Sequence, residues 1–245
     1  MPQGAALITG GSSGIGAELA RLCAAAGYEV IGVSRRPSPA GVRSLLADLS
    51  DPAAPPRIYD ELRGTPVDLL INNAGFGCNG PFAEIAWEDE AGLLQVNISA
   101  LAHLTRLFLP DMLRRGSGRI LNVASTAAFV PGPGMTVYYA SKAFVRSFSE
   151  GLAAEVGGSG VTVTVLCPGP TRTGFAAAAG VGRTHLFRGP VMEAAEVARV
   201  GFEAMMAGKT EVIAGARNRW MIFFSRFAPR TTLAGITRRL NSPAA

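Results

Sequence analysis

A serine, a tyrosine and a lysine stand at a spacing that could perform acid–base chemistry. Tyr138 lies 13 positions after Ser125 and four positions before Lys142. If Tyr138 opens a helix, Lys142 lies on the same helix face one turn further on. A neighbouring ammonium lowers the pKa of a phenol, which makes Tyr138 a candidate general acid/base near neutral pH. Tyrosine and lysine at this spacing are also common on exposed helices, so the pair alone does not establish a site.

A glycine-rich turn near the start of the chain predicts a dinucleotide-binding unit. The apolar run 5–9 leads into the turn, and a helical pattern of apolar residues follows it. Glycines permit a tight turn and let a diphosphate approach the backbone N–H groups at a helix start. The residues of this segment are Thr9-Gly10-Gly11-Ser12-Ser13-Gly14-Ile15-Gly16. Taken alone, such glycines could also form a simple turn.

Further landmarks, in register with these, resemble the short-chain dehydrogenase/reductase family over about residues 5 to 215. The landmarks are the glycine-rich turn, Asn72-Asn73-Ala74-Gly75, Asn97, Ser125 with Tyr138-x-x-x-Lys142, and Pro168-Gly169. The resemblance implies an α/β fold with a Rossmann-type doubly wound parallel sheet, in a single domain of three layers (α/β/α). It also implies an oxidoreductase that uses a nicotinamide cofactor.

The resemblance assigns roles to residues of this chain. Ser125 would bind the substrate oxygen and Tyr138 would transfer the proton, while Lys142 would tune Tyr138 and hold the nicotinamide ribose. Asn97 would hold a water that links Lys142 to solvent. The expected cofactor-binding residues are Thr9, Gly10, Ser12, Ser13, Gly14, Ile15, Gly16, Arg35, Arg36, Asp48, Leu49, Asn73, Ala74, Gly75, Tyr138, Lys142, Pro168, Gly169, Thr171 and Thr173.

The residues after the second predicted strand indicate which nicotinamide cofactor is used. An acidic residue there would bind the adenosine ribose and repel a 2′-phosphate, whereas an arginine pairs with that phosphate. This chain has Ser34, Arg35 and Arg36 at that point. We therefore expect NADP(H) rather than NAD(H), with Arg35 as the main contact. The alternative is that both arginines belong to the ordinary charged surface.

Short apolar runs alternate with helical patterns along the chain, which predicts a parallel sheet with helices on both faces. The predicted strands are 5–9, 28–33, 42–47, 67–72, 118–124, 161–166 and 211–214, and the predicted helices are 14–26, 52–63, 88–114, 137–156 and 193–207. The family usually has a helix between the second and third strands. Two prolines and a glycine in the segment 34–43 make a helix there unfavourable.

The composition and length limit the class of protein. A chain of 245 residues suits one domain, 1–245, and no apolar stretch reaches the ~18 residues that span a bilayer. Because the first strand begins at once, no room is left for a signal peptide, and we expect a cytoplasmic protein. The three cysteines have neither metal-ligand nor disulfide spacing, so no metal is expected.

Two segments bear on the substrate and on partners. Residues 174–192 fall at the family's mobile lid, and their small and apolar side chains favour a hydrophobic carbonyl or alcohol substrate. The tail 216–245 is basic and amphipathic: its six arginines have no acidic residue after Glu211, and Trp220, Phe223 and Phe224 begin a helical spacing. The tail could cover the substrate cleft, contact another subunit or lie on an anionic membrane. Binding of an acidic protein or a nucleic acid is the least favoured alternative, and we expect no nucleic-acid partner for the protein.

The sequence thus favours an NADP(H)-dependent oxidoreductase that acts on a carbonyl or secondary alcohol. A non-catalytic NADP-binding regulatory or scaffold protein of the same fold is the alternative. We also expect a homodimer or homotetramer, because relatives pair the long helices that carry Asn97 and Tyr138. Phe144, Phe148 and Leu152 form an apolar stripe on the second of these helices, which could equally be core.

Overall fold

The computed structural model describes residues 4–244 and contains a parallel sheet of seven strands. The strands lie in the order β3-β2-β1-β4-β5-β6-β9, which is that of a doubly wound sheet. Their bounds are β1 Ala5–Thr9, β2 Glu29–Ser34, β3 Arg43–Leu46, β4 Val67–Asn72, β5 Gly118–Val123, β6 Val161–Cys167 and β9 Glu211–Ile213. The central strands are buried on both faces, which explains their nearly continuous apolar sequences.

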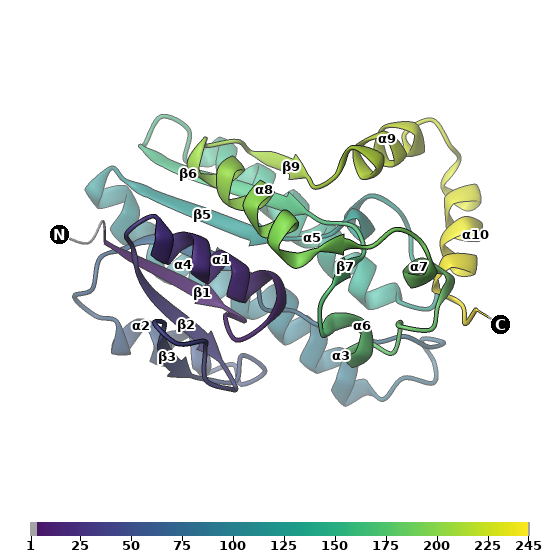
Figure 1. Ribbon diagram of the computed structural model, residues 1–245, viewed down its shortest axis with the longest axis horizontal. Helices are drawn as coiled ribbons and strands as arrows, with labels where there is room; N and C mark the ends of the chain where they lie inside the picture. Colours follow the sequence, from purple (N-terminus) through teal and green to yellow (C-terminus); the bar gives the residue numbers. More distant parts are fainter. Residues whose placement is uncertain (1–3, 245) are drawn as a thin grey trace.

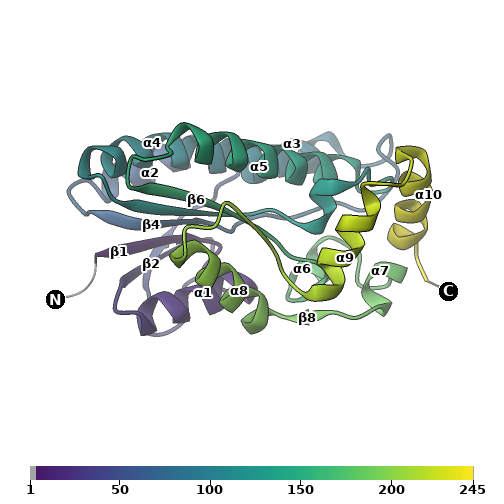
Figure 2. The ribbon, with the colours of Figure 1, turned by 90° about the horizontal axis from the view of Figure 1, so that it is seen from above.

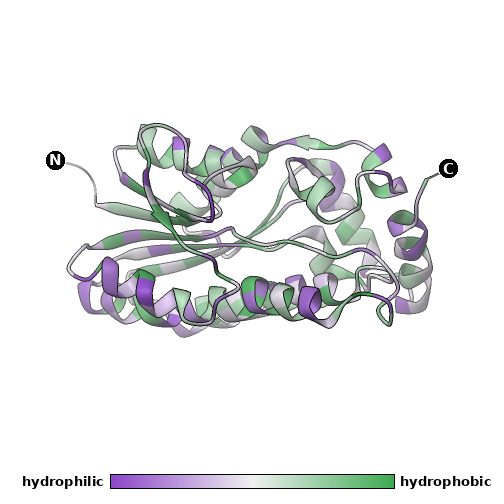
Figure 3. Ribbon diagram, turned by 90° about the horizontal axis from the view of Figure 1, so that it is seen from below, coloured by the Kyte–Doolittle hydropathy of each residue, from purple (hydrophilic) through white to green (hydrophobic). Residues whose placement is uncertain are grey.

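Helices cover both faces of the sheet and complete three layers (Figure 2). One face carries α1 (Gly14–Ala25) and α8 (Ala194–Met206). The other carries α2 (Ala54–Glu61), α3 (Trp87–Leu94), α4 (Leu101–Arg115) and α5 (Thr136–Glu155). Figure 3 shows hydrophilic residues gathered on the outer side of these helices, as expected where only the inner face packs on the sheet. The strands and helices predicted from the sequence are confirmed to within two residues at most ends.

The predicted absence of a helix between β2 and β3 is confirmed. The connecting segment folds back over the sheet, and a Cβ on Gly32 would lie 2.2 Å from the Ser38 hydroxyl oxygen. A glycine in the strand is therefore what allows this close approach. With no helix above it, the edge strand β3 leaves Leu46 exposed.

The long helix predicted at 88–114 forms as one continuous helix that contains a π-helical stretch in its middle. A π-helical stretch, η1 (Gln95–Ala100), joins α3 to α4 and contains Asn97. Such wider turns interrupt the regular hydrogen bonding of a helix and are frequent at functional sites. The sequence pattern predicts the long helix but not this π-helical turn.

The last third of the chain adds elements beyond the sheet (Figure 1). A short pair of strands, β7 (Thr171–Arg172) and β8 (Met192–Glu193), closes the base of the segment 174–192, which contains α6 (Phe175–Ala178) and α7 (His185–Arg188). The tail forms α9 (Ala216–Ser225) and α10 (Arg230–Asn241) on either side of Pro229. The helical spacing of the tail residues is therefore confirmed.

Candidate active site

The glycine-rich turn places the start of α1 at the carboxyl end of β1. Gly10 and Gly14 have φ values of +68° and +56°, a region that side chains with a Cβ disfavour. Ser13 precedes α1 without capping it through its side chain. The first N–H groups of α1 lack intrahelical partners, and a helix start of this kind binds phosphate groups.

A set of hydrogen bonds ties this turn to the end of β4. Asn73 donates from Nδ2 to the Thr9 carbonyl oxygen at 2.9 Å, and the Thr9 hydroxyl accepts from the backbone N–H groups of Asn73 and Ala74, both at 3.0 Å. A Cβ on Gly16 would lie 2.2 Å from the Gly10 carbonyl oxygen. Thr9 and Gly16 therefore shape the turn from behind, and neither lines the cavity described below.

Charged residues surround the far end of the site. Arg35 and Arg36 are exposed, and neither forms an ion pair with a described residue. Asp48 accepts hydrogen bonds from the backbone N–H and the hydroxyl of Ser50, which lower the pKa of its carboxyl group with a smaller contribution from Arg35. Leu49 is buried beside it. The carboxylate is thus fixed in position, and the charge of Arg35 acts on it without forming an ion pair.

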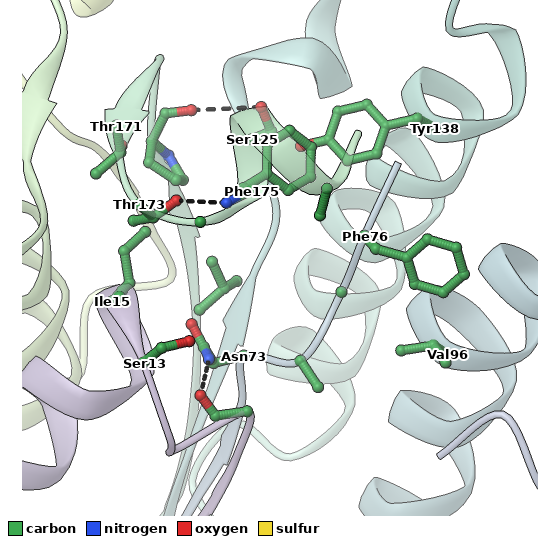
Figure 4. Close-up of a pocket in the computed structure, with 18 of the residues that line it drawn as sticks. Ser13, Ile15, Asn73, Phe76, Val96, Ser125, Tyr138, Thr171, Thr173 and Phe175 are labelled. Carbon is green, nitrogen blue, oxygen red and sulfur yellow. Dashed lines mark hydrogen bonds between the residues drawn. The ribbon is translucent and has the colours of Figure 1, made fainter. Parts of the chain in front are cut away.

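Ser125 and Tyr138 face each other at the carboxyl end of β5 (Figure 4). Ser125 caps a short 3-10 helix, η2 (Thr126–Phe129): its Oγ accepts from the Ala127 N–H at 3.1 Å. The same hydroxyl donates to the Pro168 carbonyl oxygen at 3.4 Å, a long and weak bond. Because that bond is weak, the Ser125 hydroxyl can turn to another acceptor at little cost.

Lys142 is buried and Tyr138 is partly buried, and the loss of solvent around the two groups controls their pKa values. It raises the pKa of Tyr138 well above its ordinary value, and the hydrogen bond from Ser125 opposes this effect. Burial lowers the pKa of Lys142 to about 8. Lys142 Nζ lies 5.8 Å from the centre of the Tyr138 ring and donates to the Val123 carbonyl oxygen at 2.9 Å.

Burial, and not Lys142, dominates the pKa of Tyr138 in this structure, and the tuning of Tyr138 by Lys142 stays a prediction. The lysine is one helical turn from the tyrosine, as predicted, but its own charge is disfavoured in the same buried environment. The spacing in the sequence shows that the groups meet, whereas the direction of each pKa shift depends on how deeply the fold buries them.

Asn97 holds the chain that follows β4. Its Oδ1 accepts from the Phe76 N–H at 3.1 Å, while its Nδ2 donates to the Phe76 carbonyl oxygen at 2.9 Å and to the Ser141 hydroxyl at 3.1 Å. Gly75 fits between Asn97 and Lys142, since a Cβ there would lie 3.0 Å from Asn97 Oδ1 and 3.3 Å from Lys142 Nζ. Asn97 is thus a positioning residue that does not line the cavity, and its link to solvent through a water stays a prediction.

The segment after β6 closes the site opposite the glycine-rich turn. The Thr173 side chain lies against Gly14, where a Cβ would be 3.0 Å from Thr173 Cγ2. Gly169 lies against Asn218 of α9, where a Cβ would be 2.5 Å from the Asn218 side chain. The loop 168–173 thus contacts both the start of α1 and the tail.

These parts enclose one elongated cavity of about 690 Å³, a size typical of sites for small molecules and cofactors. All the predicted cofactor-binding residues other than Thr9 and Gly16 line it. Ser125, Tyr138 and Lys142 lie together in its wall, with Arg35 and Arg36 at one end. The other end is mostly apolar and is lined by Phe76, Met135, Tyr139, Phe175, Ala178, Val181, Leu186 and Phe187.

The tail does not line this cavity: its wall contains no described residue after Phe187. The hypothesis that the tail supplies an apolar wall of the substrate site is therefore wrong, whereas a contribution of the tail to the entrance stays a prediction. Instead, the tail forms hydrogen bonds with two parts of the chain that do line the cavity. Tyr139 bonds to Asn241 of α10, and the backbone of the lid bonds to residues 242–244. An isolated asparagine in a basic tail gives no signal of this role in the sequence.

Comparison with known proteins identifies the family. A model of the short chain dehydrogenase family matches residues 4–183, most of the chain. The fold and the arrangement of Ser125, Tyr138 and Lys142 agree with that match. The protein therefore belongs to the short-chain dehydrogenase family, and it has the oxidoreductase fold of that family.

Individual relatives show how far the likeness extends. The ketoacyl reductase HetN of Nostoc sp. is 36% identical over 178 residues, which cover 66% of this chain and 62% of HetN. The uncharacterized oxidoreductase YbbO of Escherichia coli is 35% identical over 71% of this chain and 68% of its own length. A short-chain dehydrogenase from Sphingobium yanoikuyae, solved in complex with NADPH, is 31% identical with a TM-score of 0.80 and covers 100% of this chain and 99% of its own.

Proposed function

We propose that the protein is an NADP(H)-dependent oxidoreductase that transfers hydride between the nicotinamide and a carbonyl or secondary alcohol of a hydrophobic substrate. The observation that carries this proposal is the position of Ser125, Tyr138 and Lys142 in the middle of one cavity. Arginines lie at one end of that cavity and apolar side chains at the other. This arrangement suits a phosphorylated cofactor and an apolar substrate that meet at the three polar residues.

The residues of the charged end fit NADP(H). The start of α1 offers free N–H groups to a diphosphate, and the Asp48 carboxylate lies where it could accept a hydrogen bond from an adenine amino group. The guanidinium groups of Arg35 and Arg36 have no carboxylate partner among the described residues, so they are available to a 2′-phosphate. The Sphingobium yanoikuyae relative was solved with NADPH, which supports the same choice.

The proposed chemistry follows from the state of each group. When bound, the nicotinamide supplies or accepts the hydride. Burial keeps the proton on the Tyr138 phenol, so Tyr138 is ready to donate it to a substrate oxygen on which negative charge develops. The Ser125 hydroxyl is weakly bonded and can donate to that oxygen. A raised pKa keeps the Tyr138 phenol protonated at neutral pH but also makes it a weaker acid, so this shift does not set the direction of the reaction.

The apolar end of the cavity is the basis for proposing a hydrophobic substrate. Phe175 lies against the reactive tyrosine, with 5.3 Å between the ring centres of Tyr138 and Phe175. Leu186 and Phe187 of α7 continue the apolar wall. Burial of an apolar side chain of this size against a ligand contributes about 1.5–3 kcal/mol, so this surface discriminates in favour of apolar substrates.

A screen of ketones, aldehydes and alcohols, read from the absorbance of the reduced nicotinamide, tests the proposal. The matched variant is Tyr138→Phe, which keeps the ring and removes the proton. We expect turnover to fall by at least ~100-fold, the contribution of a general acid, while the Kd for NADPH stays within a few-fold. Tyr59→Phe, a tyrosine outside the cavity, serves as the control.

The same experiment separates the enzyme from the non-catalytic alternative. A scaffold protein would bind NADPH equally well in both forms and would turn over no substrate in either. Turnover by Tyr138→Phe near the wild-type rate would instead show that another group moves the proton. The convergence of three reactive side chains on one cavity favours the enzyme over the scaffold.

We also propose that the protein forms homo-oligomers through the outer face of α5. Phe144 and Phe148 are stacked there, with their ring centres 5.7 Å apart and their planes within 8°. Phe144 is exposed, and the two rings border a surface groove with Leu152 and Gly151. An exposed apolar surface on a long helix is suited to the same surface of a second copy.

A further inference from the structure

The outer face of α9 and Phe227, two residues after its end, expose four aromatic side chains to solvent. Trp220, Phe223, Phe224 and Phe227 are 61%, 45%, 62% and 75% exposed, and together they are called the aromatic stripe here. Their rings contact one another, with ring centres 5.9 Å apart for Trp220 and Phe224 and 5.5 Å apart for Phe223 and Phe227. Contiguous exposed apolar surface of this kind marks a docking site rather than ordinary surface.

The stripe points away from the body of the protein. Ile222 is the buried residue of α9, and residues two positions apart on an α-helix lie about 200° apart around its axis. Trp220 and Phe224 flank Ile222 at that spacing, so they lie on the opposite side of the helix. The inner side is fixed by Asn218, which donates to the Ala214 carbonyl oxygen at 2.7 Å and lies against Gly169. The stripe therefore stays exposed when α9 is docked as the structure shows.

Positive charge surrounds the stripe. Arg217, Arg219, Arg226 and Arg230 are exposed, and none of them forms an ion pair with a described residue. The sequence has no acidic residue after Glu211, so the charge of this region is not compensated from within the tail. Arginines beside exposed aromatic rings are the composition of a helix that lies at the surface of an anionic bilayer.

A bilayer fits this surface better than a second copy of the chain does. A two-fold contact through the stripe would place the same uncompensated arginines of both copies against each other. The helix lies beyond the carboxyl end of β9, on the side of the molecule that carries α10 (Figures 1 and 2). No helix among residues 4–244 is long and apolar enough to cross a membrane.

We propose that α9 with Phe227 is a peripheral docking site for a bilayer that contains anionic phospholipid. The aromatic rings insert between the headgroups and the acyl chains, while the arginines contact the lipid phosphates. This surface is distinct from the cavity, and the proposal stands whether or not the chain reduces carbonyl compounds.

The two tryptophans of the chain allow a direct test. Trp87 on α3 is 65% exposed and Trp220 on α9 is 61% exposed, so they are matched in exposure and differ in their surroundings. Trp87→Phe leaves Trp220 as the only tryptophan, and Trp220→Phe leaves Trp87. Each protein is mixed with vesicles of phosphatidylcholine alone or of phosphatidylcholine and phosphatidylglycerol, with bromine-labelled acyl chains as the quencher.

We expect quenching and a blue shift of the Trp220 emission with the anionic vesicles, and no change in the Trp87 emission. Salt should release the protein, because it screens the arginines. Quenching of Trp87 with Trp220 unaffected, or no binding to anionic vesicles at low salt, would overturn the proposal.

Substitutions then separate the stripe from general basic charge. Phe224→Ser and Arg226→Ala should each lower the vesicle-bound fraction at least ~fivefold, whereas Leu46→Ser and Arg63→Ala, at exposed positions outside the tail, should leave it unchanged. Retained NADPH affinity reports that each variant is folded. If Phe224→Ser changes the molar mass in light scattering and not the vesicle binding, the stripe joins two copies of the chain and the bilayer proposal is wrong.

Discussion

The Tyr139 hydroxyl donates to Asn241 Oδ1 at 3.2 Å, which joins the neighbour of Tyr138 to a residue 102 positions later in the chain. Asn241 also donates from Nδ2 to the Pro133 carbonyl oxygen at 3.0 Å, and its own carbonyl oxygen accepts from Asn79 at 3.2 Å. The side chain is buried. Through one residue, α10 thus holds both the loop before α5 and the first turn of that helix, which carries Tyr138.

We expect Asn241→Ala to change catalysis as well as stability. Buried partners left unsatisfied cost about 1–3 kcal/mol, so the free energy of unfolding should fall by that order. The loop at Pro133 borders the apolar end of the cavity, so KM for a long apolar substrate should rise severalfold while the Kd for NADPH stays unchanged. Ser242→Ala, the next residue, whose hydroxyl bonds locally to Arg239, is the control. An unchanged KM in a destabilised variant would restrict Asn241 to a structural role.

Lys142→Met should abolish most activity, and its effect on the free energy of unfolding should change with pH. The folded-state pKa of Lys142 is about 8, below its ordinary value, so above pH 8 the unfolded chain keeps a proton that the folded chain has lost. The free energy of unfolding then rises with pH through this group. The free energy of unfolding of the wild type minus that of Lys142→Met should therefore increase between about pH 8 and 10. This range lies below the one in which Tyr138 ionises.

Denaturant unfolding of both proteins at several pH values measures that difference, since groups common to both cancel. A difference that does not vary with pH would mean that burying the charged Lys142 side chain costs no free energy. Titration with NADPH adds a second readout: the variant should bind more weakly if Lys142 also holds the ribose, and equal affinity would remove that role.

Arg35→Ala should remove the preference for NADPH over NADH. We expect wild type to bind NADPH at least tenfold more tightly, a difference of about 1.4 kcal/mol that one charge-assisted contact can supply. Arg36→Ala, at the adjacent exposed position, tests whether the effect belongs to one arginine. Isothermal titration with both nucleotides gives the ratio directly. A ratio near one in the wild type would identify both arginines as ordinary surface charge.

Phe148→Asp should convert an oligomer to a single chain. The substitution places a charge in the stacked pair with Phe144, where the second copy would bury it without a partner. Light scattering with size-exclusion chromatography should show the mass of about two or four chains for wild type and of one chain for the variant. Leu46→Asp, on the exposed edge strand, should leave the mass unchanged. A wild-type mass of one chain at micromolar concentration would contradict the proposed interface.

Local patterns in the sequence predict the sheet and the residues that line the cavity, because each pattern is set by neighbours in the chain. Apolar runs correspond to strands buried on both faces, and the prolines at 37 and 39 exclude a helix between β2 and β3. The spacing of Tyr138 and Lys142 places both in one wall.

What the sequence could not predict depends on contacts between distant residues. The pKa shifts of Tyr138 and Lys142 follow from burial by several elements at once. The role of Asn241 follows from partners about 100 or more positions earlier, and a polar residue in a tail has no periodicity that would reveal them. The π-helical turn at Asn97 is likewise accompanied by bonds to the backbone of Phe76, which a helical pattern does not record.

The lid is fastened by the chain that follows α10. Thr184 forms a β-bridge with Pro243. The Ala244 N–H donates to the Arg183 carbonyl oxygen at 2.9 Å, and the His185 N–H donates to the Ser242 carbonyl oxygen at 3.3 Å. Segments fastened in this way open together as one cooperative unit. Amide hydrogen exchange at His185 and Ala244 should therefore proceed at similar rates while the central strands remain protected. A substitution that loosens the chain's last helix would in this way alter which molecules the enzyme accepts, without changing a residue that touches them.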